Sequence, residues 1–206
     1  AYEIYQCDWS SDVCSSDLTV VNAGVMLTKL LQISAGSIYS NTKGVIEFDV
    51  SNRMTALKEI IEEASHKVIV FCPFRHSIEL IMTELRKSGT TCDAIHGDVS
   101  MHKRTEIFKN FQESKDPQVL VIQPQSASHG VTLHAANVVV FWSPVMSVET
   151  YIQCCARMDR AGQKNKMTVV HLQGSPVETR IYKMLQNKID THTKLVDLYK
   201  EELADA

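Results

Sequence analysis

Short, wholly apolar runs alternate with segments of helical periodicity along most of the chain. Such runs are typical of strands that are buried on both faces of a parallel sheet. Together with the more polar segment TCDAIH at 91–96, they predict strands at 67–72, 91–96, 118–123, 137–142 and 167–172. Between them, apolar residues recur at helical spacing and predict helices at 75–87, after Ser100, at 148–158 and at 175–203. This alternation implies an α/β fold, a mainly parallel sheet with helices on both faces.

The residues before this alternation predict a helix, a hairpin and a second helix. Apolar positions from Val21 to Ile33 predict the first helix, with Gly36 as its stop. Residues 36–49 alternate around a polar turn and predict a β-hairpin. Ser51 is of a type that caps the next helix. We therefore expect three parts, which are a tail at 1–18, a helix and hairpin at 19–50, and an α/β domain with a long C-terminal helix at 51–206.

The composition is that of an ordinary globular protein, with 44% hydrophobic and 22% charged residues. No apolar run approaches the roughly 18 residues that a membrane span requires, so we expect no membrane partner. The six cysteines contain no C-x-x-C pair, which favours reduced thiols and a cytoplasmic protein.

The first eighteen residues differ from the rest of the chain. They hold four acidic residues and no Lys or Arg, whereas the remainder carries 21 basic and 20 acidic side chains. The net charge of −3 therefore comes from this tail, and any basic patch on the body must be local. Translated backwards, the tail resembles an indexed sequencing-library adapter. We expect a non-native tail that packs against nothing, Trp9 and Val13 included, with protein sequence from near Thr19.

The segment after the fourth predicted strand contains the most informative candidate residues. Arg157 and Arg160 stand three residues apart at the expected end of a helix, so they lie on the same side of it. A guanidinium is always charged, and its planar fork of donors suits phosphate oxygens. Spacing alone also fits two solvated arginines, or a structural pair with Asp159.

The segment after the third predicted strand is rich in small polar residues, among them Ser126, Ser128 and Gly130. Such a loop can bring backbone N–H groups close to phosphates, although most loops of this kind only connect elements. His129 and His134 have no carboxylate or Cys partner at ligand spacing, so we expect no metal site.

Four segments together resemble a known family. In order they are VIVFCPFRHSIELI, IHGDVSMHKRTEIFKNFQ, LVIQPQSASHGVTLHAAN and QCCARMDRAGQ. Their order and spacing resemble the C-terminal RecA-like motor lobe of superfamily-two helicases, and most of all the Swi/Snf-like group, including versions carried by bacteriophages. The likeness covers about Leu30 to Tyr182, and it suggests a bacterial or phage-infected cell as the source.

The resemblance implies a role for each candidate residue. Arg160 would be the arginine finger toward ATP and Arg157 its partner, with Gln153 at the contact between lobes and Gly130 coupling nucleotide to nucleic acid. Strand contacts would come from the following residues: Arg75, His96, Gly97, Ser126 and Ser128. Nucleic acid is the implied partner, DNA more than RNA. Two departures, Asp159 in place of a common His and Thr132 in place of a common Asn, weaken the match locally.

The sequence contains no G-x-x-x-x-G-K-[ST] loop and no D-E-x-[HD] carboxylate pair. In the family both belong to an N-terminal RecA-like lobe, which would precede Thr19 and would hold Mg²⁺ with the ATP. We therefore expect this chain to be a fragment that is inactive alone, because arginine fingers act on an otherwise assembled site. The alternatives are a non-catalytic nucleic-acid-binding module and a protein-interaction module, whereas other nucleotide-binding α/β enzymes would need a G-x-G-x-x-G turn.

Overall fold

The computed structural model describes residues 2–6, 23–40, 44–128, 133–159 and 163–204. Six strands form a parallel sheet in the order β1-β8-β7-β4-β6-β5. Their bounds are β1 Tyr2–Gln6, β4 Lys67–Phe71, β5 Cys92–Ile95, β6 Val119–Ile122, β7 Ala136–Phe141 and β8 Thr168–Gln173. All five predicted strands are confirmed. The apolar residues of β4, β6 and β7 are buried inside the covered sheet, whereas β5, at the edge, keeps Asp93 and Ala94 partly exposed.

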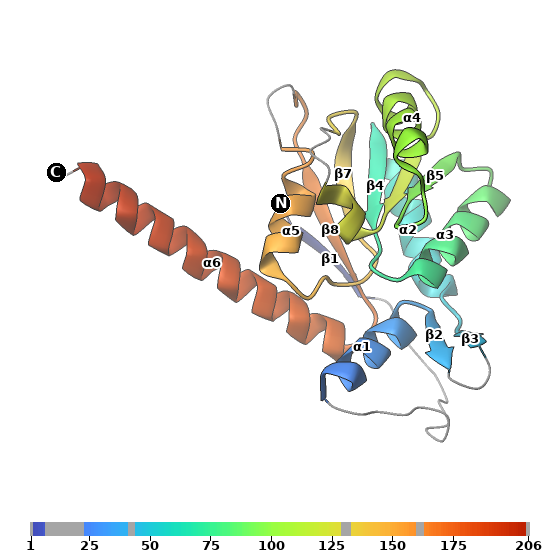
Figure 1. The fold of residues 1–206 in the computed structure, drawn as a ribbon, viewed down its shortest axis with the longest axis horizontal. Coiled ribbons are helices and arrows are strands. Elements are labelled where there is room, and N and C mark those ends of the chain that lie inside the picture. The colour runs from blue at the N-terminus through green and yellow to red at the C-terminus, as the bar shows by residue number, and fades with distance from the viewer. Residues whose placement is uncertain (1, 7–22, 41–43, 129–132, 160–162, 205–206) are drawn as a thin grey trace.

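Helices cover both faces of this sheet, as predicted (Figure 1). On one face, α2 (Ser51–Glu63) and α3 (Arg75–Lys87) pack their apolar sides. On the other lie α4 (Met101–Glu113), α5 (Val148–Cys155) and the first turns of α6 (Pro176–Ala204). Alternate residues of β4 serve the two cores, with Ile69 on the α4–α6 side and Val70 on the α2–α3 side.

The predicted leading helix and hairpin are present as α1 (Ala23–Ser34) and an antiparallel pair, β2 (Ser37–Ser40) with β3 (Gly44–Glu47). Gly36 ends α1 with a φ of +97°, a conformation that favours glycine. A Cβ at this position would lie 2.3 Å from Val50 Cγ1, so the close approach also requires glycine. The turn from α1 into the hairpin therefore follows from this one residue.

Of the two predicted helix caps, the one at Ser100 is confirmed and the one at Ser51 is wrong. Ser100 caps α4 as expected, because its Oγ accepts from Lys103 N at 3.4 Å. The prediction that Ser51 caps α2 is wrong. Ser51 is the first helical residue, and Asp49 Oδ1 accepts its N–H at 2.9 Å. An Asp two residues upstream offers the same acceptor with a charge that suits the helix N-terminus.

The tail at the start of the chain requires a correction. We expected residues 1–18 to pack against nothing, yet Tyr2–Gln6 form β1, which pairs in parallel with β8. The physical reason is that β8 would otherwise present a free edge of backbone donors and acceptors, and Tyr and Ile favour strands. Trp9 and Val13 lie outside the described residues. The adapter origin of the tail stays a prediction.

Candidate nucleic-acid and nucleotide interface

The carboxyl ends of the central strands bring together three of the predicted strand-contact residues. Arg75 opens α3 directly after β4, and His96 and Gly97 follow β5. Arg75 Nη1 lies 2.7 Å from His96 Nδ1. Carboxyl ends of parallel strands share one edge of a sheet, which is why residues 21 positions apart in the sequence meet here.

Gln123, which sequence reasoning missed, holds these loops in place. It follows β6, and its Nε2 donates to Pro73 O at 3.4 Å while its Oε1 accepts from Gly97 N at 3.3 Å. Its backbone N–H donates to Ile95 O at 2.8 Å. One amide therefore connects the segments after β4, β5 and β6. The only signal in the sequence is a polar residue directly after a buried strand.

The charges around Arg75 are largely balanced. Arg75 Nε lies 3.0 Å from Glu79 Oε1, and Nη1 also pairs with Asp98. Arg104 Nη2 donates to His96 O at 2.8 Å, which adds a second guanidinium. Burial, and then the positive charge of Arg75, lower the pKa of His96. A neutral His96 accepts the Arg75 N–H at Nδ1, so this ring carries its proton on Nε2.

Arg157 lies in a turn and not on a helix, which corrects the expected span 148–158. Helix α5 ends at Cys155, and Arg157 N donates to Cys154 O at 3.3 Å in a tighter turn. Its carbonyl accepts from Leu133 N at 2.9 Å, which joins this turn to the end of the loop that follows β6. The residue is only 8% exposed, so Arg157 is buried in the lobe and does not project into solvent.

The other predicted site residues differ in their exposure to solvent, and two of them lie outside the described part of the chain. Gln153 lies on the exposed side of α5, close in sequence to Arg157. Ser126 is buried at 6% exposure in a short 3₁₀ helix, η2 (Pro124–Ser128), which Ser128 ends. Gly130 and Arg160 lie outside the described residues.

His134 hydrogen-bonds with an amide: its Nδ1 lies 3.1 Å from Gln112 Nε2. Within the described ranges, no group of three or more His, Cys, Asp or Glu side chains is arranged to hold a metal ion.

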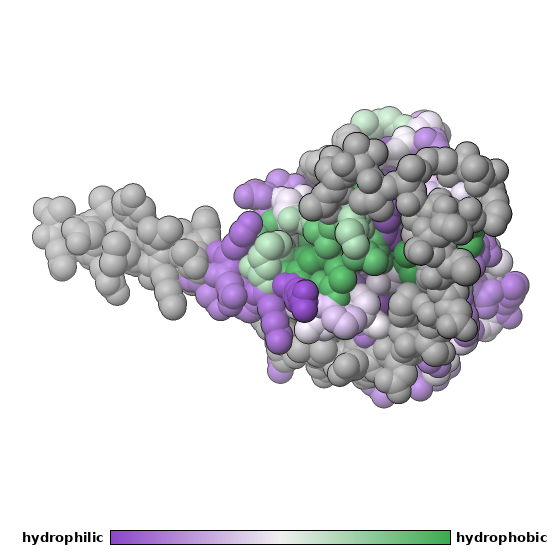
Figure 2. All heavy atoms as spheres, turned by 90° about the horizontal axis from the view of Figure 1, so that it is seen from below, coloured by the Kyte–Doolittle hydropathy of each residue, from purple (hydrophilic) through white to green (hydrophobic). Residues whose placement is uncertain are grey.

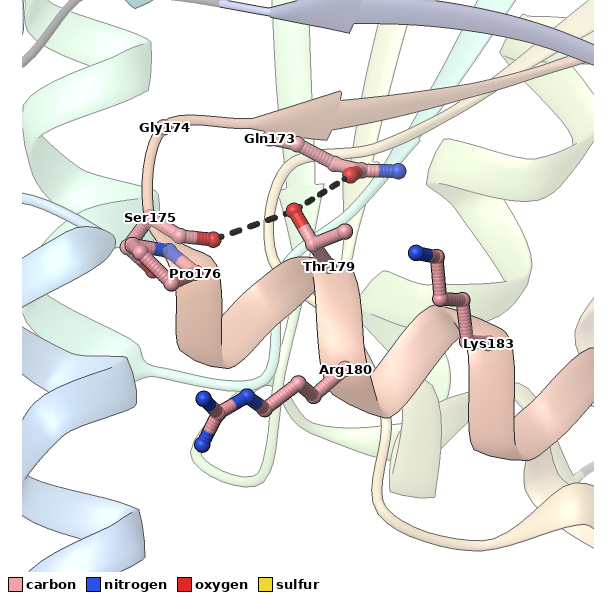
Figure 3. Close-up of a pocket in the computed structure, with 7 residues that line it drawn as sticks. All are labelled: Gln173, Gly174, Ser175, Pro176, Thr179, Arg180 and Lys183. Atoms are coloured by element: carbon pink, nitrogen blue, oxygen red, sulfur yellow. Dashed lines mark hydrogen bonds between the residues drawn. The ribbon is translucent and has the colours of Figure 1, made fainter.

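A polar pocket of about 340 Å³ lies at the carboxyl end of β8. It is lined by Gln173, Gly174, Ser175, Pro176, Thr179, Arg180 and Lys183. Figure 3 shows Thr179 hydrogen-bonded to Gln173 and to the Ser175 carbonyl, with Lys183 one turn further along α6. The Glu178 carboxylate already caps the start of this helix, because it accepts from Gly174 N at 2.8 Å. Sequence reasoning did not single out these residues.

Apolar side chains gather on the side of the molecule that carries α1 (Figure 2). Exposed apolar residues there include Met26 on α1 at 51% and Met146 at 49%, which follows β7. Between these two segments lies a pocket of about 220 Å³, lined in part by Leu31, Phe74 and Val145. The carboxyl edge therefore combines an apolar part near α1 with the polar loops after β4 and β5.

A family model, described as "Helicase conserved C-terminal domain", matches residues 52–162. This chain belongs to that family. The match covers more than half of the chain and includes the loops at Arg75, His96, Ser126 and Arg157.

Curated relatives of this helicase C-terminal domain carry two kinds of name. A putative SWI/SNF-related regulator of chromatin, subfamily A member 3-like 1, from Arabidopsis thaliana is 27% identical over 146 residues, which are 67% of this chain and 17% of the relative. DEAD-box ATP-dependent RNA helicase 5 from Oryza sativa is 30% identical over 114 residues, 55% of this chain and 22% of the relative. The chain thus spans about a fifth of the length of these relatives.

Two solved structures confirm the RecA-like helicase fold. The C-terminal part of the Fun30 ATPase domain superposes with a TM-score of 0.61 at 19% identity, covering 68% of this chain and 48% of that one. The C-terminal domain of the DEAD-box protein Dbp5 gives a TM-score of 0.58 at 18% identity, covering 68% and 80%. At this level of identity they show the fold.

Other expectations stay predictions. Relatives with RNA-helicase names stand beside SWI/SNF-related ones, so the preference for DNA is still to be tested. The relatives named above are from plants, and the bacterial or phage source likewise stays a prediction. None of the helices in the described part of the chain is both long and apolar enough to cross a bilayer.

Proposed function

We propose that this chain is the C-terminal motor lobe of an ATP-dependent nucleic-acid helicase or translocase. The observation that carries the proposal is the meeting of the loops after β4, β5 and β6 at one edge of the sheet, with Arg75 2.7 Å from His96 and Gln123 bonded to both loops. Loops fixed to one another in this way keep their spacing when the lobe moves as a body. A motor lobe that advances along a strand requires that rigidity.

The nucleotide side of the proposal rests on Arg160 as the finger toward the γ-phosphate of ATP and Arg157 as its partner. The 8% exposure of Arg157 and the bond from Leu133 N to its carbonyl support a positioning role for this residue, which would fix the turn that leads to Arg160. The same bond holds Leu133, three residues after Gly130 in the sequence, against the turn at Arg157, which supports including Gly130 in the proposal. Gln153 would contact the second lobe from its exposed position on α5.

The residues of this chain could form part of an ATP site, but they do not form a complete ATP site. The sequence has neither a phosphate loop nor a D-E-x-[HD] pair, and among the described residues no three or more His, Cys, Asp or Glu side chains are grouped to hold a metal ion. Mg²⁺ and the β-phosphate would therefore be held by an N-terminal RecA-like lobe. When ATP is bound there, the guanidinium groups of this lobe would stabilise charge that builds on the transferred phosphoryl group.

On the nucleic-acid side, Arg75, His96 and Gly97 would follow the backbone of one strand, with Ser126 and Ser128 at the neighbouring loop. Contacts to phosphates position a strand without reading its sequence, which suits a translocase. We propose DNA over RNA because of the likeness to the Swi/Snf group. The four described cysteines are free thiols, which supports a cytoplasmic setting.

The decisive experiment uses a parent protein that carries both lobes. Arg160→Ala should lower ATP turnover by about three to five orders of magnitude while DNA binding persists, because the finger acts on the transition state. The matched control is Lys164→Ala, which removes an exposed cation four residues away and should leave turnover unchanged. An unchanged rate in Arg160→Ala would remove the finger assignment, and robust hydrolysis by the 206-residue chain alone would overturn the two-lobe account.

The burial of Arg157 favours a second candidate, a protein-interaction module built on a degenerate lobe. Such a module would use these arginines only for structure. It predicts that Arg160→Ala in the two-lobe parent changes thermal stability but not the ratio of ATP turnover with and without nucleic acid.

A further inference from the structure

The β2–β3 hairpin places an aromatic pair beside the Arg75–His96 loops. The ring centroids of Tyr39 on β2 and His76 on α3 lie 4.8 Å apart, with the planes tilted by 58°. His76 directly follows Arg75, so this pair and the predicted strand-contact loops are neighbours on the same edge of the lobe. No sequence pattern connects the hairpin to this site.

The position of Tyr39 is fixed by contacts on either side of the hairpin. Ser37 and Ser77 hydroxyls lie 3.0 Å apart in a buried contact between β2 and α3. On the other side, Lys29 Nζ on α1 donates to the Tyr39 carbonyl. Tyr39 nevertheless remains 41% exposed, so its backbone is held in place while the residue still presents aromatic surface to solvent.

The charges nearby favour a flat, neutral group over a phosphate at this position. Glu79 Oε2 lies 3.3 Å from His76 Nδ1, and Glu79 Oε1 lies 3.0 Å from Arg75 Nε. This carboxylate would repel a phosphate next to the rings. Burial, and then Glu79, raise the pKa of Tyr39, which keeps its hydroxyl neutral.

We propose that Tyr39, backed by His76, is a stacking platform for a nucleobase of the strand whose backbone passes the Arg75–His96 loops. The inference rests on the proposed function and specifies it, because a stacked base requires an unpaired or opened strand. Proteins that hold single strands combine cationic tracks with exposed aromatic rings, and every base has a face that can stack. The contact is therefore independent of sequence.

The test measures binding of the full 206-residue chain to a short fluorescent oligothymidylate and to an abasic oligonucleotide of equal length. Tyr39→Ala should weaken binding to the oligothymidylate by about five- to hundredfold. Tyr39→Phe should bind as the wild type does, because the ring remains. Tyr39→Leu keeps the bulk without the ring and should show the loss even if the alanine variant folds poorly. Met184→Ala, an exposed apolar position on α6, is the matched control.

Two further readouts separate stacking from charge. Tyr39→Ala and the wild type should bind the abasic oligonucleotide with the same affinity. On the oligothymidylate, the fold-change in affinity caused by Tyr39→Ala should be the same at low and high salt, because no phosphate contact is removed. Wild-type affinity in both the Ala and Leu variants would overturn the stacking inference and leave the proposed function standing. A wild-type chain that binds neither oligonucleotide would overturn both.

Discussion

Stability at mildly acidic pH should depend on one buried histidine. His171, in β8, is 7% exposed and packs its ring 4.3 Å from that of Tyr182 and 5.6 Å from that of Phe141. Its Nε2 lies 3.0 Å from Tyr151 Oη. Burial lowers the pKa of His171 to about 4. The folded protein therefore keeps this imidazole neutral at pH values where an unfolded chain protonates it.

The sign and the size of the effect follow from linkage. An unfolded histidine has a pKa of about 6.5, so between that value and about 4 the unfolded state binds more protons than the native state. The free energy of unfolding must fall as the pH falls through this window, and it levels off below it. At about pH 5 protonation favours the unfolded state roughly thirtyfold, which corresponds to about 2 kcal/mol.

Urea unfolding at about pH 7.5 and about pH 5 measures this term in wild type and in His171→Phe. The variant also loses the bond to Tyr151, so the informative quantity is each protein's own drop between the two pH values. The wild-type drop should exceed that of His171→Phe by about 2 kcal/mol. His102→Asn, on the exposed side of α4, should keep the wild-type drop. An equal drop in wild type and His171→Phe would refute the reasoning.

Two further predictions concern the scaffold. Arg53→Met should cost about 3–5 kcal/mol in urea unfolding, because it leaves the buried Glu178 carboxylate without the guanidinium 2.7 Å away. Adding Glu178→Gln to that variant should recover part of the loss, and a cost below about 1 kcal/mol for Arg53→Met would contradict the buried pair. Gly36→Ala should lower the free energy of unfolding by more than about 1 kcal/mol, since it strains a positive φ and places a Cβ against a neighbour. An unchanged urea midpoint in Gly36→Ala would show that this turn can relax.

Much of the architecture could be predicted because local patterns determine it. A run such as Val119–Ile122 has no polar face, so it must be a covered strand, and a series of such strands joined by helices must be parallel. The resemblance placed Arg75 and His96 on strand-contact loops, and the shared carboxyl edge of parallel strands explains why the structure makes them neighbours. Ends of elements were less secure, because Asp49 and Ser51 are both good caps and α5 tightens before Arg157.

The unpredicted parts of the site are pairings between distant polar residues. Gln123 is one of many glutamines in the chain, and only the packed sheet shows that its amide reaches two loops. Tyr39 alternates with buried Ile38 in a strand pattern that many hairpins share. Its neighbour His76 lies 37 positions away, and no spacing rule connects the two. Sequence patterns specify which face a residue takes, but they do not specify which side chain it meets.

The buried ion pair also connects the matched family region to the rest of the chain. Arg53 lies inside the region 52–162, whereas Glu178 lies beyond it on α6. Arg53 also donates to the Trp142 carbonyl, and the Trp142 indole donates to Ala35 O at 3.0 Å, at the end of α1. One buried chain of bonds thus joins α1, the sheet and α6. The hairpin that carries Tyr39 follows α1 directly, so these bonds also connect the hairpin to the sheet and to α6.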